Sequence, residues 1–441
     1  MRAGGRRGVA NVTRIVFIGA GSVEFTRNLL GDILTFPELA ESEIVLHDIS
    51  PERLETAEAM ARWTADAVGA HPAISSHLDR RRAVDGADFV IDTIEVGGIA
   101  ATRKDFEIPA RYGLRQTIAD TLGVGAVFRA LRTIPVLLEI GADLAELAPD
   151  SLFLNYTNPM AINCQAYFQG SPHTAIVGLC HSIQNTSRQV ADYVGVPFDE
   201  VTFLGAGVNH MSWVLRLERD GEDLYPLLDK AIAADPEGLG RHVRVEVYRR
   251  FGFFPTESSE HFAEYVPWLM RDGAEIERLR IPVDEYIRRS EENLELYADE
   301  VRKLAAGEPF EIERSGEYAS LIIHSMVTGR ERTVYGNVRN AGLITNLPSE
   351  ACVEVPCLVD RAGVQPTVIG ELPPQCAALD RTFLNVAGLT VSAALEERRD
   401  RVLQAMMLDP NCAATLSIEQ MVALRDELLD AHRDLLPEGL R

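Results

Sequence analysis

Two residues of the sequence carry the donor atoms of a transition-metal site. Cys180, in the segment GLCHS, offers a thiolate, and His210, in GVNHMSW, offers an imidazole. Sulfur and imidazole nitrogen together suit a divalent transition metal. The thirty positions between them match no recognised metal-binding spacing, so a structural cysteine and a core histidine are the alternative interpretation. Only the fold can decide whether the two residues meet.

Two further side chains could move protons. Asp120, in ADTLG, is a candidate general acid or orienting group, and its alternative is a cap for the helix that follows. Tyr265 is a candidate base, but tyrosine titrates at about pH 10, so it needs a metal or another cation to lower its pKa. The alternative is a packed ring with a bonded hydroxyl. His261 precedes Tyr265 by four positions, and the two would share one face of a helix.

A glycine-rich loop of sequence GAGS follows a short β-branched run and precedes a helical segment. Glycines let the backbone turn tightly and approach a pyrophosphate, which rests on the helix N-terminus. We expect Gly19, Gly21, Ser22 and Val23 to bind a dinucleotide, and Ser22 to cap the helix. Glu24 replaces the third glycine of the usual fingerprint. A glycine turn without a ligand is therefore the alternative.

Polar residues also follow other predicted strands. Asp48 ends the second strand, where its carboxylate can accept a hydrogen bond from a ribose 2′-hydroxyl and would repel a 2′-phosphate. This favours NAD over NADP. Asn155 and Asn158, in NYTNPM, and Glu95 follow further strands. Ligands of open α/β sheets bind at the carboxyl ends of the strands, so these residues are candidate binding residues.

A parallel sheet is required to bring these residues together. Short apolar strands alternate with helical segments over residues 13–180, which predicts an α/β fold with an N-terminal Rossmann-like domain. We predict a tail over 1–12, this NAD-binding domain over 13–195, and a mixed α+β domain over 196–441 that completes the site. The expected strands are 13–18, 43–47, 88–94, 152–154, 175–179, 201–204 and 213–217, and the expected helices are 23–36, one starting at 50–51, 126–147, 284–305, 392–407 and 417–435.

Composition narrows the class of protein. The 441 residues are 46% hydrophobic and 25% charged, which excludes collagen-like, disordered and disulfide-scaffold chains. With 43 basic and 66 acidic side chains the net charge is −23, which argues against nucleic acid or an anionic membrane as partner. No apolar run approaches the roughly 18 residues of a membrane span. The six cysteines form no C-x-x-C pair, so we expect free thiols and a cytoplasmic location.

Several motifs, in order along residues 13–430, carry a family resemblance. They are VFIGAGS (16–22), DFEIPARYGLRQTIADTLG (105–123), FRALRTIPV (128–136), NYTNPM (155–160), GLCHS (178–182), GVNHMSW (207–213), SEHFAEYVPW (259–268), N-x-G-x-I-x-N-L-P (340–348) and VEVP (353–356). In these motifs the chain resembles glycoside hydrolase family 4, whose members depend on NAD and a divalent metal.

The residues after the cysteine track the substrate within that family. Members acting on 6-phospho sugars resemble Cys-Asp or Cys-Asn, whereas Cys180-His181-Ser182-Ile183 is similar to the CHSV form of melibiose-type α-galactosidases. Ile183 and Ile99 depart from that subgroup and leave the sugar open. The resemblance implies an α-galactosidase acting on non-phosphorylated α-glycosides, and an α-glucosidase or α-uronidase is the alternative.

The resemblance also implies roles for individual residues. Cys180 and His210 become ligands of a divalent ion, with Mn²⁺ as the first choice. Tyr265 matches the base, Asn158 is expected to contact the sugar, and Asn155 is expected to lie on the nicotinamide side.

The implied mechanism is redox-assisted elimination and addition. NAD⁺ takes a hydride from sugar carbon 3, and the resulting ketone acidifies the proton on carbon 2. Tyr265 removes that proton while the metal stabilises the ene-diolate. The aglycone leaves carbon 1 with the help of an acid, water adds, and the hydride returns, so NAD is not consumed. His181 and Asp120 are both candidates for the acid.

Two other classes of protein share part of this pattern. A lactate- or malate-type dehydrogenase would share the dinucleotide fold without needing a metal thiolate. A non-catalytic NAD-binding protein would need the glycine loop and Asp48 but not Cys180, His210 or Tyr265. For the enzyme, we expect a small α-glycoside as the partner molecule and a homodimer or homotetramer as the assembly.

Overall fold

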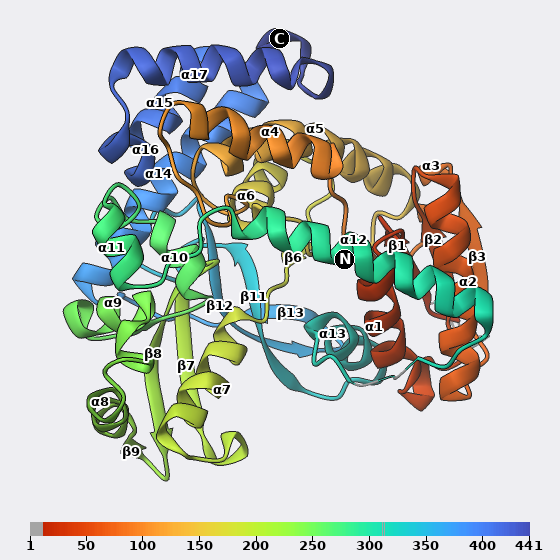
Figure 1. Cartoon of the computed structure of the whole chain (residues 1–441). Coiled ribbons are helices and arrows are strands. Elements are labelled where there is room, and N and C mark those ends of the chain that lie inside the picture. The colour runs from red at the N-terminus through yellow and green to blue at the C-terminus, as the bar shows by residue number, and fades with distance from the viewer. Residues whose placement is uncertain (1–11, 311, 313) are drawn as a thin grey trace.

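The computed structural model describes residues 12–310, 312 and 314–441, and the side chains of residues 23 and 24 are outside this description. The predicted tail over 1–12 therefore lies outside the described residues, apart from the exposed Val12. Strands and helices alternate through the first half of the described chain, and a mixed pattern follows (Figure 1).

Six parallel strands form one half of a continuous sheet. They are β1 (Arg14–Ile18), β2 (Glu43–His47), β3 (Ala73–His77), β4 (Phe89–Asp92), β5 (Leu152–Asn155) and β6 (Ile176–Gly178). Their order is β6-β5-β4-β1-β2-β3, and each neighbouring pair is parallel. This is the doubly wound order of dinucleotide-binding sheets, so the predicted fold class is confirmed. No pattern predicted β3, because its sequence AISSH lacks an apolar run.

Helices connect these strands. They are α1 (Val23–Leu34), α2 (Pro51–Val68), α3 (Arg80–Val84), α4 (Gly98–Arg111), α5 (Val124–Leu147), α6 (Met160–Gly170) and α7 (Ser182–Val194), with a short 3₁₀ helix, η1 (Pro37–Leu39). Ser50 caps α2 as the sequence predicts. Ser22 stands at the N-cap of α1, but its side chain makes no cap hydrogen bond. The predicted cap is wrong, because the backbone at Ser22 (ψ 72°) is not extended as a capping residue requires.

The second half of the chain adds antiparallel strands to the same sheet. They are β7 (Thr202–Val208), β8 (Met211–Arg219), β9 (Glu222–Asp223), β10 (Phe254–Pro255), β11 (Arg332–Arg339), β12 (Cys352–Asp360) and β13 (Gly363–Pro366). The sheet continues from β6 through β11, β12, β7 and β8 to β10, and the described residues contribute 13 strands. Because one sheet runs through both halves, the division at residue 195 stays a prediction.

The helices of the second half are α8 (Tyr225–Ala234), α9 (Val243–Phe251), α10 (Ser259–Glu264), α11 (Gly273–Arg278), α12 (Glu285–Ala306), α13 (Tyr318–Thr328), α14 (Pro374–Glu396), α15 (Arg399–Leu408), α16 (Pro410–Thr415) and α17 (Ile418–Ala431), with 3₁₀ helices η2 (Phe198–Glu200), η3 (Leu239–Arg241), η4 (Arg433–Leu435) and η5 (Glu438–Leu440). The helices predicted over 284–305 and 417–435 correspond to α12 and to α17 with η4. The single helix predicted over 392–407 is wrong, because Glu397 adopts a left-handed φ of 53° and separates α14 from α15.

The C-terminal helices pack back onto the first half. Helix α14 contacts α5 and α6, α17 contacts α4, and α13 contacts α1. Figure 1 shows α14 to α17 gathered beside α4 and α5. None of the described helices is both long and apolar enough to cross a bilayer.

Candidate active site

The fold brings Cys180 and His210 into contact. A row of paired residues, Gly178–Asn337–Glu354–Gly207, crosses four strands and links the strand before Cys180 to the strand before His210. Cys180 follows β6, and His210 lies in the tight turn between β7 and β8 with a left-handed φ of 63°. The sulfur of Cys180 is 3.4 Å from Nε2 of His210.

A buried hydroxyl sets the orientation of the His210 ring. Thr121 Oγ1 is 2.8 Å from Asp120 Oδ1 and 2.7 Å from His210 Nδ1. An ionised carboxylate only accepts hydrogen bonds, so Thr121 donates to Asp120 and accepts from Nδ1–H of His210. This arrangement leaves the Nε2 lone pair directed at the side of Cys180. Supporting bonds of this kind fix the tautomer of metal-binding histidines.

The donor atoms fit a divalent cation. Those of Cys180, His210 and Glu257 all lie within 4.8 Å of one another, and a second set, Asp120, His210 and His261, does the same. Burial raises the pKa of the Cys180 thiol to about 12, so a bound cation is needed to keep the thiolate at neutral pH. Burial alone would raise the pKa of Glu257, but His210 and His261 lower it below its ordinary value.

Asp120 lies at the centre of a polar network. Its Oδ2 accepts a hydrogen bond from Nδ2 of Asn158 at 2.9 Å, and its Oδ1 lies 3.6 Å from Nε2 of His261. Burial would raise the pKa of Asp120, but the bond to His261 and the nearby charges hold it well below its usual range. The alternative role as a helix cap is wrong, because Gly123 is the N-cap residue of α5.

Tyr265 directly follows α10 and faces the same cluster. Its ring centre is 6.4 Å from that of His261, so the shared face predicted from their spacing is confirmed. The hydroxyl is buried without a hydrogen bond of ordinary geometry to the described residues. Burial, with Asp120 and Glu264 nearby, raises the pKa of Tyr265 well above its ordinary value. Tyr265 can act as a base only beside a positive charge.

His181 is tied to a second carboxylate. Its Nδ1 lies 3.1 Å from Oε1 of Glu317, the residue before α13. This hydrogen bond raises the pKa of His181 to about 9. His181 is therefore protonated at neutral pH, and its side chain is half exposed.

The glycine loop has the geometry of a nucleotide-binding turn. Gly19 has a φ of 81°, and a Cβ there would lie 2.9 Å from the carbonyl carbon of Thr93. The backbone N–H of Gly21 donates to Oδ2 of Asp48 at 2.8 Å, which joins the loop to the end of β2. Ser22 is exposed, while the side chain of Val23 lies outside the described part of the chain. This loop requires glycine for its turn and its close approach.

The remaining predicted site residues differ in their solvent exposure and in their hydrogen bonds. Asn155 is fully buried, and its side-chain amide donates to the carbonyl of Thr157 at 3.2 Å. Asn158 is held by Asp120, as described above. Glu95 is exposed and accepts hydrogen bonds from Arg129 and Thr102, each at 3.1 Å. Asn158 therefore joins the cluster of Asp120, whereas Asn155 is engaged by its own loop.

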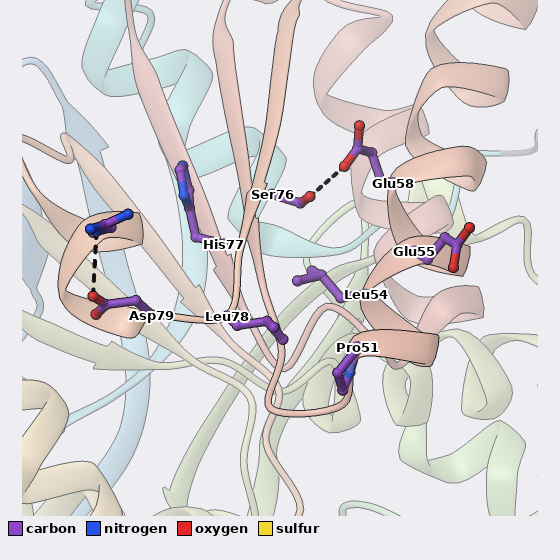
Figure 2. Close-up of a pocket in the computed structure, with 9 residues that line it drawn as sticks. Pro51, Leu54, Glu55, Glu58, Ser76, His77, Leu78 and Asp79 are labelled. Atoms are coloured by element: carbon purple, nitrogen blue, oxygen red, sulfur yellow. Dashed lines mark hydrogen bonds and ion pairs between the residues drawn. The ribbon is translucent and has the colours of Figure 1, made fainter.

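A pocket of about 490 Å³ lies elsewhere, between the first turns of α2 and the β3–α3 connection (Figure 2). Its lining includes Glu55, Glu58 and Asp79, and Figure 2 shows the hydrogen bond from Ser76 to Glu58. It contains none of the residues predicted for catalysis. The candidate active site is therefore the cluster around Cys180 and His210.

The fold and the cluster define a dinucleotide-binding α/β protein with a thiolate–imidazole pair that could hold a metal ion. Residues 14–196 match the family 4 glycosyl hydrolase model, and residues 205–412 match the model of the family 4 glycosyl hydrolase C-terminal domain. The chain belongs to family 4 of the glycosyl hydrolases, a family with NAD-dependent chemistry. The predicted family is confirmed, and the dehydrogenase and non-catalytic interpretations are not favoured.

Relatives cover nearly the whole chain. An alpha-galactosidase of Bacillus subtilis (strain 168) is 44% identical over 430 residues, which cover 96% of this chain and 99% of the relative. An alpha-galactosidase of Rhizobium meliloti (strain 1021) is 35% identical and covers 96% and 89%. The solved 6-phospho-alpha-glucosidase from gut microorganisms, in complex with NAD and Mn²⁺, has a TM-score of 0.81 at 21% identity over 97% of this chain and 100% of its own.

Three residues of the cluster were missed by sequence reasoning. Thr121, Glu257 and Glu317 belong to no strand-end pattern and to no metal-ligand spacing. Their contacts with His210, His261 and His181 join segments far apart in the chain. Thr121 follows Asp120 directly, which is the one local signal that could have suggested it.

Proposed function

We propose that this chain is an α-galactosidase that hydrolyses neutral, non-phosphorylated α-glycosides by NAD-dependent redox elimination and addition at a divalent metal. The observation that carries the proposal is the contact between Cys180 and His210 with Tyr265 in the same cluster. The 44% identical relative named as an alpha-galactosidase supports the choice of sugar.

Cys180 and His210 would hold the metal, Mn²⁺ as the first choice, and the glycine loop with Asp48 would hold NAD. Bound NAD⁺ would supply a reversible hydride acceptor for sugar carbon 3, and the bound ion would supply positive charge that stabilises the anion formed on the sugar. In the dinucleotide site Gly19 and Gly21 let the backbone approach the pyrophosphate, with Ser22 and Val23 at the helix start.

Tyr265 takes the proton from sugar carbon 2. Its buried hydroxyl has a raised pKa, so positive charge in the cluster is needed to lower that pKa and allow the phenolate to form. Asn158 contacts the sugar and is oriented by its hydrogen bond to Asp120. Asn155 would lie on the nicotinamide side of the site.

His181 is the better candidate for the acid that protonates the leaving oxygen. Its pKa of about 9 keeps the proton available at neutral pH. Asp120 has a lowered pKa and already accepts two hydrogen bonds, so it has no proton to give and orients Thr121 and Asn158 instead.

Charge around the metal pair supports a neutral sugar. The carboxylates of Asp120, Glu257 and Glu317 lie at or beside the cluster. They would repel a phosphate or a uronate carboxylate on the substrate. This disfavours the α-uronidase alternative, whereas the α-glucosidase alternative differs only in the orientation of one hydroxyl.

The test is hydrolysis of 4-nitrophenyl α-galactoside and α-glucoside by the purified chain, with and without NAD⁺, Mn²⁺ and a reductant. We expect nitrophenol release from the galactoside that needs all three additions and leaves no net NADH. Release from the glucoside alone would mean that the chain is an α-glucosidase rather than an α-galactosidase. NADH formed from a hydroxy acid without nitrophenol release would refute the proposal.

The assembly and the compartment belong to the same proposal. We expect a homodimer or homotetramer in a reducing cytoplasm, without nucleic acid or membrane partners. The free cysteines of the described chain, five of them buried, and a ligand set that uses a thiolate support the reducing compartment.

A further inference from the structure

We infer that Glu257 is a third protein ligand of the divalent metal, beside Cys180 and His210. The inference rests on the metal site of the proposed function. One carboxylate oxygen of Glu257, the sulfur of Cys180 and a ring nitrogen of His210 lie within 4.8 Å of one another. Three atoms bound to one ion at about 2.0–2.3 Å would have this spacing.

The chain holds Glu257 rigidly in an unusual conformation. Thr256 is anchored to β8, because its N–H donates to the carbonyl of Ser212 at 2.8 Å and its hydroxyl accepts from the N–H of Ser212 at 3.2 Å. Ser258 caps α10 on the other side. Between these anchors Glu257 has a φ of 67°, which is a left-handed backbone for a residue that is not glycine. Such strain is found where function requires a side chain in one place.

The carboxylate of Glu257 is available for an ion. Its described contact is to Nδ1 of His261 at 3.5 Å, and that nitrogen already bonds to the hydroxyl of Ser258 at 2.9 Å. The side chain of Glu257 is one-quarter exposed. A carboxylate that is neither buried in a tight ion pair nor fully solvated suits metal binding.

The second set of donors is less suited. Both oxygens of Asp120 accept hydrogen bonds, from Thr121 and from Asn158. His210 belongs to both sets, so the difference lies in the other donor atoms. The donor atoms of Cys180, His210 and Glu257 are therefore less engaged in other hydrogen bonds than those of the second set.

A thiolate, an imidazole and a carboxylate define the chemistry of the site. Three protein ligands would leave room in the coordination sphere of the ion for water or sugar hydroxyls. The hard carboxylate oxygen also shifts the preference of the site toward Mn²⁺ and away from softer ions. Glu257 would thereby influence which metal ion the site prefers as well as how tightly the site binds it.

The test measures Mn²⁺ binding to the full chain from the electron paramagnetic resonance signal of free Mn²⁺, with reductant and without sugar. The variants are Glu257→Gln, the matched control Glu260→Gln on the same segment, and Cys180→Ser. We expect Glu257→Gln to raise the Kd for Mn²⁺ at least about tenfold, since even outer partners of a metal ligand cost that much. Glu260→Gln should stay within about twofold, because Glu260 is outside the donor set.

The outcomes separate this inference from the proposed function. A Glu257→Gln variant that binds Mn²⁺ as the wild type does, while Cys180→Ser loses it, overturns the role of Glu257 alone. If Cys180→Ser also binds normally, the proposed metal site fails as well. NAD⁺ binding and thermal unfolding in a chelator check that each variant is folded.

A second variant covers the case in which Glu257→Gln does not fold. Glu257→Asp keeps the charge and withdraws the carboxylate by one methylene. With Co²⁺ bound, we expect it to keep the thiolate-to-metal absorption band and to change the visible d–d bands. Identical d–d bands in Glu257→Asp and the wild type would overturn the inference.

Discussion

Thr121 connects an ionised carboxylate to the imidazole of a proposed metal ligand. Its hydroxyl donates to Asp120 and accepts from His210, so one side chain determines which nitrogen of His210 is free. The same Asp120 also orients Asn158. A small residue thus links the proposed metal site to the proposed sugar-binding residue Asn158.

Replacing Thr121 by valine removes this link while keeping the shape of the side chain. We expect Thr121→Val to weaken Mn²⁺ binding by about 10- to 100-fold, because His210 loses the bond that orients its ring. Thr121→Ser should restore most of the affinity, since it restores the hydroxyl. Titration of Mn²⁺ against both variants is the measurement. Equal affinities of the valine and serine variants would contradict the relay.

The pair of His181 and Glu317 makes activity depend on pH. The hydrogen bond raises the pKa of His181 to about 9, so the protonated form is present below that pH and is lost above it. The pair therefore contributes stability below the unfolded pKa of about 6.5, and this contribution disappears as pH rises through about 9. If His181 is the acid, kcat should fall over the same upper range.

Substitution Glu317→Gln tests this dependence. We expect the alkaline limb of the kcat profile to move from about pH 9 toward the ordinary histidine value of about 6.5, because the carboxylate that holds the proton is gone. His181→Ala should abolish the limb and lower the rate for substrates with poor leaving groups. An alkaline limb that stays in place in Glu317→Gln would exclude His181 as the titrating acid.

At the scale of elements, a buried ionic cluster fastens the C-terminal helix α17 to α4 and α5. Asp105 on α4 accepts two hydrogen bonds from Arg132 on α5, at 3.2 and 2.6 Å. Nε2 of His432, which follows α17, lies 2.9 Å from the same carboxylate. All three side chains are at most 2% exposed. Arg132 also donates to the carbonyl of Val96, so the cluster reaches the loop after β4.

Removing the shared carboxylate should strongly destabilise the fold. Asp105→Asn leaves the buried charge of Arg132 without its counter-ion, and we expect a loss of about 3–5 kcal/mol in the free energy of unfolding. The matched control is Glu427→Gln, which breaks the exposed pair of α17 with Arg111 and should cost less than about 1 kcal/mol. Urea unfolding of the two variants measures the difference, and similar losses would contradict the role of the buried cluster.

At the scale of the whole molecule, the active site is built from both halves of one sheet. The first half contributes Asp120, Thr121 and Cys180, and the second contributes His210 and Tyr265. The two halves of the sheet are joined by the pairing of β6 with β11. Neither half contains both of the proposed metal ligands, Cys180 and His210, so their contact depends on the continuity of the sheet.

The amino-acid sequence by itself determined the dinucleotide half of the protein. The β-branched run before GAGS, Asp48 at the end of β2 and the alternation of strands with helices are local signals, and each depends only on neighbouring residues. The order of the motifs along the chain likewise indicates an enzyme of this family, because each motif is a short run of adjacent residues. The predicted capping of α1 by Ser22 was wrong, because the nucleotide loop determines the backbone conformation of Ser22.

Only the tertiary structure decided how the catalytic cluster is assembled. Cys180 and His210 meet because four strands pair across the sheet, and no spacing rule encodes that distance. Glu257 and Glu317 join the cluster from separate segments of the second half. Hydrogen bonds and nearby charges then overcome the effect of burial, so that the pKa of Asp120 is lowered and the pKa of His181 is raised. Such contacts between distant segments depend on packing, which local patterns in a sequence do not specify.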